Sequence, residues 1–385
     1  MGRFRAALAA PGLAAIAEFK RRSPSAGAIR ADADPARFAG LYTSGGAAAM
    51  SVLVDERFDG SLGDLRAARA ATDLPLLAKG FFTTREQLLE LREAGADAAL
   101  LILRDLDDAG AERLMAHARE LGLDTLVEAH DADELARATR LGADPIGVNA
   151  RNLGSFRIDR RAQLELVAAA PRDRVVVAES AVHSRAQGAA AELAGAGAIL
   201  VGTALMRASD PAAKLRELLS RPLVKVCGLT RQEDVDAAAE AGADLAGFIL
   251  AEESPRRAAG VLRVPETMLS VAVYVGERGE ERADLDQLYG REDGHRGRDA
   301  SLLRGEREVA RVLDLPWESS DPEHLRRAAA AAGRVVLAGR LDAGNVGAAI
   351  RSVRPWAVDA ASRLESEPGI KDHARVRAFV EAARA

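Results

Sequence analysis

The feature that most constrains the fold is a repeated alternation between short apolar runs and amphipathic segments. Segments such as REQLLELREAGAD (85–97) and DELARATRLGAD (133–144) carry apolar residues at helical spacing. A Gly-Ala-Asp phrase follows the expected helix at 95–97, 142–144 and 242–244, and a glycine just past the last turn is a common helix stop. Continuous apolar strands that alternate with helices are typical of a parallel sheet covered on both faces.

Strand-like runs recur through the whole first half of the chain. They fall at 13–19, 50–54, 75–79, 98–103, 125–129, 145–149, 174–179 and 198–202. Eight β-then-α units within about 210 residues predict a closed TIM-type (β/α)₈ barrel. A fresh strand-like run begins after the Arg-Pro pair at 221–222, so we expect one domain at 1–220 and a second at 221–385.

The second half repeats the pattern in a shorter length. Its strand-like runs fall at 223–228, 246–250, 271–276, 285–290, 309–315, 334–339 and 357–362. Seven such runs predict a second TIM-type barrel that is shortened and lacks one β/α unit or its strand. The stretch 277–307 is rich in charge and glycine, and we expect a mobile loop there.

Composition excludes several classes of protein. The net charge of −5 argues against a nucleic-acid-binding surface built on bulk basicity. No run of about 18 apolar residues is present, so we expect no membrane span. The N-terminal run is interrupted by Pro11 and Gly12 and leads into the charged EFKRR, which argues against a signal peptide, and we expect a cytoplasmic protein. The sequence gives no indication of oligomeric state.

Cysteine and lysine are so rare in this chain that each one can be considered individually. Cys227 is the only cysteine, so no intrachain disulfide can form. The lysines stand at 20, 79, 214, 225 and 371, while all other basic residues are arginines. Lys20, Lys79 and Lys225 fall in strand-like runs, where a solvated ammonium is unexpected.

Polar side chains gather where the strands of the first half end. Catalytic groups of TIM barrels lie at the carboxyl ends of the strands. One ionisable group there is often only a structural salt bridge, but so many are costly to bury unless they act on a ligand. The strand ends carry Glu18, Lys20, Lys79, Glu128, Asn149, Arg151, Glu179, Ser180, Gly202 and Thr203.

A series of motifs in the first half resembles one enzyme family. The segments AEFKRRSPSAG, PLLAKGF, TLVEAH, IGVNARNL, VVAES and LVGTALM resemble, in order, the strand motifs of indole-3-glycerol-phosphate synthase, over about residues 10–210. The resemblance implies a decarboxylating ring closure of a small phosphorylated, anthranilate-derived substrate, with no metal or cofactor. It implies Lys79 as the general acid and Glu128 as the general base, with Lys20 holding the anionic substrate.

The same resemblance assigns the remaining strand-end residues. It implies substrate binding by Glu18, Ser23, Asn149, Arg151, Glu179 and Ser180, and phosphate binding at Ala181, Gly202 and Thr203. Three positions depart from the family's pattern: Gly80 stands where the family has Asp, Ala181 where it has Gly, and Ala26 where it has Lys. These departures predict a synthase of weakened or retuned activity.

The second half resembles phosphoribosylanthranilate isomerase, which makes the synthase's substrate by an Amadori rearrangement. The resemblance covers about 222–375 and rests on VKVCGLT, GFILAEESPRR, VAVYVGE, DQLYG, LAGRLDAGNV and AVDAASRLESEPGIKD. It implies Cys227 as the general base, Arg256 as a substrate-binding residue, Asp359 as a polar group on the last strand and Gly339 as part of the phosphate site.

The family's general acid has no clear counterpart. Either a β/α unit has been deleted, or strand five is lost and Asp314 takes the acid's place with Trp317 beside it. Tyr289, Arg340 and Arg363 also depart from the family's His, Gly and Gly. Two interpretations therefore stay open for this half: a working, trimmed isomerase, or a pseudoenzyme barrel with a structural or regulatory role.

Two wider alternatives concern the whole chain. Other phosphate-binding barrels, of histidine or pentose metabolism, share the fold but not the EFKRRSPS, VEAH and GVNARNL series. A non-enzymatic binding scaffold is disfavoured because Lys20, Lys79 and Glu128 are all in place.

Overall fold

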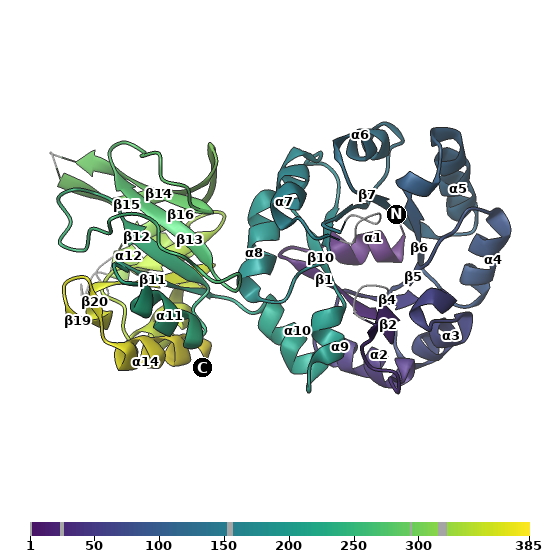
Figure 1. The fold of residues 1–385 in the computed structure, drawn as a ribbon, viewed down its shortest axis with the longest axis horizontal. Coiled ribbons are helices and arrows are strands. Elements are labelled where there is room, and N and C mark those ends of the chain that lie inside the picture. The colour runs from purple at the N-terminus through teal and green to yellow at the C-terminus, as the bar shows by residue number, and fades with distance from the viewer. Residues whose placement is uncertain (1, 24–26, 152–156, 293–294, 315–321) are drawn as a thin grey trace. The chain divides into compact units, whose positions relative to one another are not determined.

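A computed structural model of the chain describes residues 2–23, 27–151, 157–292, 295–314 and 322–385. Ala26 and Trp317 lie outside these ranges. The chain divides into two compact units, residues 1–183 with 188–219 and residues 184–187 with 220–385 (Figure 1). Within the described ranges, no helix is long and apolar enough to cross a membrane.

The first unit contains a closed barrel of eight parallel strands, as the sequence predicts. Each strand pairs in parallel with its neighbours, and β1 closes the ring by pairing with both β4 and β10. The strands are β1 (Ala14–Phe19), β4 (Ala49–Leu53), β5 (Leu76–Lys79), β6 (Ala98–Ile102), β7 (Asp124–Ala129), β8 (Ile146–Asn149), β9 (Val176–Glu179) and β10 (Ala198–Val201).

Helices cover the outside of this barrel in sequence order (Figure 1). Many begin with a side-chain cap that satisfies the first free N–H groups, as in the reciprocal Ser61–Asp64 and Thr84–Gln87 capping boxes. The helices are α2 (Pro35–Ser44), α3 (Leu62–Ala71), α4 (Arg85–Glu93), α5 (Asp108–Glu120), α6 (Ala132–Arg140), α7 (Arg160–Ala169), α8 (Arg185–Ala194), α9 (Thr203–Arg207) and α10 (Pro211–Leu219).

The amino-terminal end of the first barrel is closed by the short helix α1 (Arg3–Leu8). Phe4 and Leu8 are buried among the inward-facing residues of the strands, such as Ile16 and Leu126. The main-chain N–H of Arg5 also donates to the Asp124 carboxylate at the start of β7. The helix α1 therefore fills the amino-terminal end of the barrel, and the end at the carboxyl termini of the strands remains for a ligand.

The second unit is also a closed barrel of eight strands, but of mixed direction. Strand β15 runs antiparallel to both neighbours, and all other pairs are parallel. The strands are β11 (Leu223–Cys227), β12 (Leu245–Ile249), β13 (Leu269–Val275), β14 (Leu285–Glu292), β15 (His295–Arg304), β16 (Arg307–Asp314), β17 (Val335–Ala338) and β18 (Ala357–Ala360).

This arrangement corrects the expectation of seven strands and a loop at 277–307. The loop prediction fails for the later part of this stretch, because β14 covers residues 285–292 and β15 begins at residue 295, whereas residues 276–284 form neither helix nor strand. In β15 the buried residues Gly297, Ala300 and Leu302 are set among Arg, Asp and Ser, so a strand with one polar face was mistaken for a loop. The shortened barrel keeps its strands and loses helices instead.

Helices accompany only part of the second barrel (Figure 1). They are α11 (Gln232–Glu240), α12 (Pro322–Ala330), α13 (Val346–Val353) and α14 (His373–Arg384). Between β13 and β14 the connection is an arm without a described helix, residues 276–284. Its Arg278 forms ion pairs with Asp286 on β14 and with Glu306 between β15 and β16, which tie the arm to the sheet.

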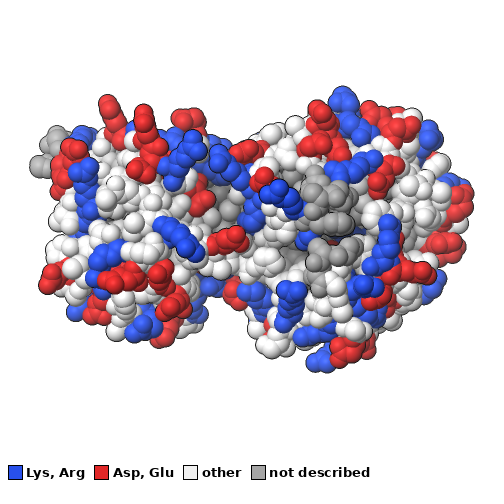
Figure 2. Space-filling view, viewed as in Figure 1, with Lys and Arg blue, Asp and Glu red and all other residues white. Residues whose placement is uncertain are grey.

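Charged side chains of both signs are interspersed on the face of the molecule that Figure 2 shows. Acidic and basic groups alternate there without a broad region of a single sign. Such a mixed surface favours solubility and provides no continuous track for a polyanion on this face.

Candidate active sites in the two barrels

A cavity of about 320 Å³ opens at the carboxyl ends of the first barrel's strands. Of the site residues that the sequence predicts for this barrel, only Glu179 does not line it, because its side chain lies buried behind Lys79. The predicted residues that line the cavity are Glu18, Lys20, Ser23, Lys79, Glu128, Asn149, Arg151, Ser180, Ala181, Gly202 and Thr203.

Lys79 lies at the centre of three carboxyl groups. Its Nζ is 2.7 Å from Glu179 Oε2 and 3.7 Å from the nearest oxygens of Glu18 and Glu128. Burial alone would lower the pKa of Lys79, but the three carboxyl groups raise it above its usual value. Lys79 is therefore an ammonium that can donate a proton only to a strongly basic atom, such as a developing alkoxide.

The three carboxyl groups differ in protonation. Burial favours the acid form of each, but Lys20 and Lys79 hold the pKa of Glu18 below its usual value. Lys79 and the imidazole of His130 likewise lower the pKa of Glu128. For Glu179, burial and the neighbouring Glu128 outweigh Lys79 and raise its pKa. Of the neighbouring groups Glu128 and Glu179, Glu128 is thus the anion, and Glu179 is the one that binds a proton more readily.

The loop after β9 has an unusual backbone. Ser180 and Ala181 have φ angles of 69° and 57°, in the left-handed region that favours glycine. The Ser180 hydroxyl donates to Asn149 Oδ1 at 2.8 Å, and the same oxygen accepts the N–H of Arg151 at 2.9 Å. The chain thus keeps at Ala181 the conformation that the family's glycine adopts without strain.

Close packing explains two glycines of the site. A Cβ on Gly202 would lie 2.3 Å from Glu18 Oε1 and 3.0 Å from Lys20 Nζ. The ion pair between Glu18 and Lys20 therefore requires a glycine directly after β10. A Cβ on Gly80 would lie 2.8 Å from Cζ of Phe82. The Phe82 ring therefore occupies space that the aspartate of the family's pattern would need.

Sequence reasoning missed an apolar wall of the cavity. Apolar residues at strand ends carry no signal that separates a binding wall from a core, so no pattern could have identified them. Arg57 lies over the Phe81 ring, 3.8 Å from its centroid. The wall is formed by Leu53, Phe58, Phe81, Leu100, Ile102, Ile158 and Leu200 and suits a planar aromatic group.

His130 was also missed, although the TLVEAH motif contains it. Its Nε2 is 3.2 Å from Glu128 Oε1, and its Nδ1 is 3.0 Å from Glu134 Oε2. Burial opposes charge on the ring, but the two carboxylates raise the pKa of His130 to about 9. An imidazolium between two carboxylates helps to keep Glu128 ionised.

In the second barrel, a buried lysine joins the strands around Cys227. Lys225 Nζ donates to Asp359 Oδ2 at 2.7 Å and to Gln287 Oε1 at 2.8 Å. Gln287 in turn donates to the Tyr289 hydroxyl at 2.8 Å. Cys227 is 5% exposed, and burial raises the pKa of its thiol, an effect that the nearby Lys225 ammonium opposes.

Asp314 ends β16, the sixth strand of this barrel. Its carboxylate is 2.7 Å from a guanidinium nitrogen of Arg296, which stands near the start of the antiparallel strand β15. The same guanidinium lies 4.3 Å from the ring centroid of Tyr289. Burial raises the pKa of Tyr289 well above its usual value, with Asp314 and Asp359 as further causes, so these groups share one interior.

Arg256 and Gly339 complete the predicted residues of this barrel. Arg256 Nε donates to both carboxylate oxygens of Glu365 at 2.9 Å. Gly339 follows β17 with a φ of 111°, and Arg340 beside it has a φ of 54°. Arg340, like Ala181 in the first barrel, has a left-handed backbone conformation at a position where the family's pattern has a glycine.

Comparison with known proteins gives a family match in each half. The family model "Indole-3-glycerol phosphate synthase" matches residues 3–218, and the model "N-(5'phosphoribosyl)anthranilate (PRA) isomerase" matches residues 318–382. An indole-3-glycerol phosphate synthase of Nocardioides sp. is 49% identical over 219 residues, which cover 57% of this chain and 83% of the relative. That of Streptomyces griseus is 47% identical over 216 residues, or 56% of this chain and 80% of the relative.

Solved structures also match the chain. TrpF from Jonesia denitrificans is 28% identical, with a TM-score of 0.34, over 43% of this chain and 97% of that one. A phosphoribosyl anthranilate isomerase from Thermotoga maritima is 25% identical, with a TM-score of 0.34, over 43% and 99%. On the family models and the curated relatives, this chain belongs to the indole-3-glycerol phosphate synthase family and carries a C-terminal match to phosphoribosylanthranilate isomerase.

Proposed function

We propose that the chain catalyses two consecutive steps of tryptophan biosynthesis. The first barrel closes 1-(2-carboxyphenylamino)-1-deoxyribulose 5-phosphate to indole-3-glycerol phosphate, with release of CO₂ and water. The second barrel makes that substrate from phosphoribosylanthranilate. The observation that carries the first assignment is the buried pair of Lys79 and Glu128, 3.7 Å apart at one face of an apolar-walled cavity.

Ring closure needs a proton donor at the substrate's carbonyl. The aromatic carbon that bears the carboxylate attacks the carbonyl carbon of the sugar chain, and Lys79 protonates the oxygen as it becomes an alkoxide. The C–CO₂⁻ bond then breaks, CO₂ leaves, and its electron pair restores the aromatic ring. Placing the substrate's aromatic ring against Phe58, Phe81 and their neighbours removes water from the carboxylate, which favours its loss.

Dehydration then forms the indole. Glu128, kept as an anion by Lys79 and His130, removes a proton from the ring CH₂ carbon beside the nitrogen while the hydroxyl on the neighbouring carbon leaves as water, which forms the ring's new double bond. A proton for this leaving hydroxyl comes from the ammonium of Lys20, which faces the cavity from the other side beside Glu18. We assign the substrate's phosphate to the main-chain N–H groups around Ala181, Gly202 and Thr203.

For the second barrel we assign the general base to Cys227 and the general acid to Asp314. The thiolate removes the C2 proton of the sugar, and the acid protonates the ring oxygen as the ring opens. A rival interpretation, a barrel without catalysis, is favoured by the Arg296–Asp314 ion pair, because it occupies the proposed acid. We place both reactions in the cytoplasm, where a free thiol such as Cys227 persists.

Complementation of two auxotrophic strains, one lacking each activity, tests the proposal directly. We expect growth of both strains with the wild-type chain. Growth of neither strain would overturn the proposed function. Growth of the synthase-deficient strain alone, together with equal phosphoribosylanthranilate conversion by wild type and Cys227→Ala, would establish the rival interpretation for the second barrel.

A further inference from the structure

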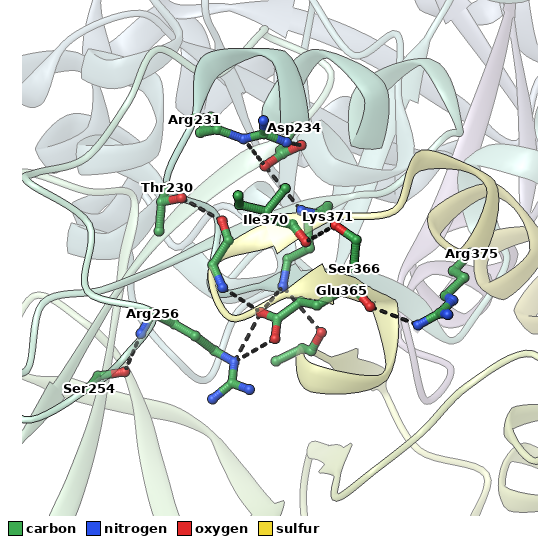
Figure 3. Close-up of polar contacts among 12 residues, drawn as sticks. Thr230, Arg231, Asp234, Ser254, Arg256, Glu365, Ser366, Ile370, Lys371 and Arg375 are labelled. Atoms are coloured by element: carbon green, nitrogen blue, oxygen red, sulfur yellow. Dashed lines mark hydrogen bonds and ion pairs between the residues drawn. The ribbon is translucent and has the colours of Figure 1, made fainter.

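Three charged residues of the second unit, Arg256 and the buried Glu365 and Lys371, form one cluster (Figure 3). Glu365 and Lys371 face each other across the small hairpin of β19 (Glu365–Glu367) and β20 (Ile370–Lys371). Their side chains are 4% and 0% exposed, and Lys371 Nζ is 2.8 Å from Glu365 Oε1. Arg256, which follows β12, binds the same carboxylate from the other side. One carboxylate therefore stands between two cations, and the cluster has a net charge of +1.

The cluster holds Arg256 by one nitrogen only. Its Nε donates to both oxygens of Glu365, and its two terminal nitrogens point away from the carboxylate in Figure 3. The main-chain N–H of Arg256 also donates to the Ser254 hydroxyl. Glu365 thus fixes the orientation of the guanidinium while the nitrogens suited to a two-fold contact with a carboxylate stay available.

The same cluster reaches the residue next to Cys227. A Cβ on Gly228 would lie 3.2 Å from Arg256 Cδ and 3.5 Å from Lys371 Nζ. Lys371 donates to Glu365 and, at 3.1 Å, to the carbonyl of Ala361. Among the described residues these contacts use two of the three ammonium protons, which leaves one for the side where β11 ends.

Charge balance shows which cation affects the thiol. The groups facing Cys227 are Lys225 on its own strand, Asp359 on β18, Lys371 on β20 and Tyr289 on β14. Lys225 and Asp359 form an ion pair that cancels in charge, and the phenol of Tyr289 is neutral because its pKa is raised. Against the effect of burial, Lys225 lowers the pKa of the thiol most, Asp359 opposes it, and Lys371 lowers it further, so the Arg256–Glu365–Lys371 cluster supplies the positive charge that no neighbouring carboxylate balances.

We propose that Arg256, Glu365 and Lys371 form a positioning cluster in which Lys371 stabilises the thiolate of Cys227 and Glu365 directs Arg256 toward a substrate carboxylate. The part that concerns substrate rests on the proposed isomerase function. The part that concerns the thiolate does not, because it follows from the charge of Lys371 and from the position of its ammonium beside Gly228, the neighbour of Cys227. The two variants Lys371→Met and Glu365→Gln remove opposite charges from the cluster. We therefore expect them to shift the pKa of the Cys227 thiol in opposite directions.

Alkylation of the full chain by iodoacetamide as a function of pH tests the thiolate part, because Cys227 is the only cysteine. We expect Lys371→Met to slow alkylation at pH 8 about tenfold, as for a shift of one pKa unit. Lys371→Arg restores most of the rate, and Glu365→Gln accelerates it. Arg377→Met, which removes one exposed positive charge from α14, serves as the matched control and leaves the rate unchanged.

The direction of each change separates the outcomes. If Lys371→Met and Glu365→Gln both slow alkylation, or if Lys371→Met has no effect while circular dichroism shows a folded chain, the thiolate role is wrong. In parallel, Glu365→Gln is expected to raise the KM for phosphoribosylanthranilate more than it lowers kcat. A folded variant with unchanged KM overturns the role in directing Arg256. A wild type without isomerase turnover but with opposite alkylation shifts would refute the proposed function and leave the charge role standing.

Discussion

The two barrels are both closed rings of eight strands, but their strands are connected in different ways. The first has parallel strands throughout and helices between them, whereas the second replaces the middle helices with an antiparallel meander of β14, β15 and β16. Both keep parallel strands where their proposed catalytic residues lie: Lys79 and Glu128 in one, Cys227 and Asp314 in the other. The comparison teaches that a barrel can lose the helices on one side and still bring the same strand ends to one mouth.

The two mouths also distribute charge differently. In the first, one lysine contacts three carboxyl groups, so protonation of any one affects the others. In the second, Lys225 pairs with Asp359 and Arg296 pairs with Asp314, so these four charges are matched one to one, and the Arg256–Glu365–Lys371 cluster adds a net charge of +1. We therefore expect single substitutions in the first mouth to change the whole site, and those in the second to act more locally.

The largest effect is expected for Lys79→Met. Loss of the proton donor should lower the kcat of the synthase by about 10²–10⁴-fold and leave isomerase turnover unchanged. Steady-state assays of both reactions measure this. Lys214→Met is the matched control, because among the described residues the Lys214 side chain pairs with Glu217 on the same helix, α10, away from the cavity. A parallel loss of isomerase activity would show that the two barrels do not work independently.

Asp314→Asn should give the next largest effect. If Asp314 protonates the ring oxygen, isomerase kcat falls about 10²-fold while synthase kcat is retained. Asp299→Asn on β15 is the control, since Asp299 is 4.0 Å from Arg311 and partly exposed. An isomerase rate that Asp314→Asn leaves intact would assign the acid to another group.

Glycine restored at the two left-handed positions should stabilise each barrel. Ala181→Gly and Arg340→Gly relieve φ angles of 57° and 54°, and we expect each to raise the free energy of unfolding by about 0.5–1 kcal/mol. Urea denaturation measures this, with Ala204→Gly in helix α9 as a control that should destabilise by about 1 kcal/mol. Stabilisation by one substitution and not the other would show that the two loops are strained differently.

Synthase turnover extends this test to the departures from the family's pattern. Ala181→Gly is expected to increase the rate, since a methyl group is removed where the backbone approaches the phosphate. The double variant with Gly80→Asp should gain more only if Phe82 is also made smaller, because its ring fills the space beside residue 80. No gain in either variant would contradict the prediction of a weakened synthase.

The smallest effect concerns the pH dependence of the first barrel. The pKa of His130 rises from 6.5 to about 9 on folding, because Glu128 and Glu134 outweigh the cost of burial. Its stabilisation is therefore complete below pH 6.5 and is lost as the pH rises through about 9. The Tm advantage of wild type over His130→Gln should shrink across this range, and a constant difference would contradict the assignment.

The site residues that could be predicted from the sequence are ionisable residues at the ends of apolar strands. Lys79, Glu128 and Glu179 could be found because an ionisable group at a buried strand end is costly and therefore noticeable. Phe58 and Phe81 could not, because an apolar residue in a binding wall looks like one in a core. Lys371 belongs to a motif that the sequence displays, but its role depends on a hairpin that folds back beside Cys227. The strand β15 was not predicted because its many polar residues made the alternation of buried and exposed positions hard to recognise.

The reversed direction of β15 has a consequence for how this barrel could change. In a parallel strand, the residues that reach the mouth come last, and the connection that follows must still lead to a helix. In β15 they come first, so Arg296, the second residue of the strand, stands at the rim. Residues at this rim can therefore vary in identity or number without displacing any helix, which makes this edge the easiest place to evolve a new substrate preference.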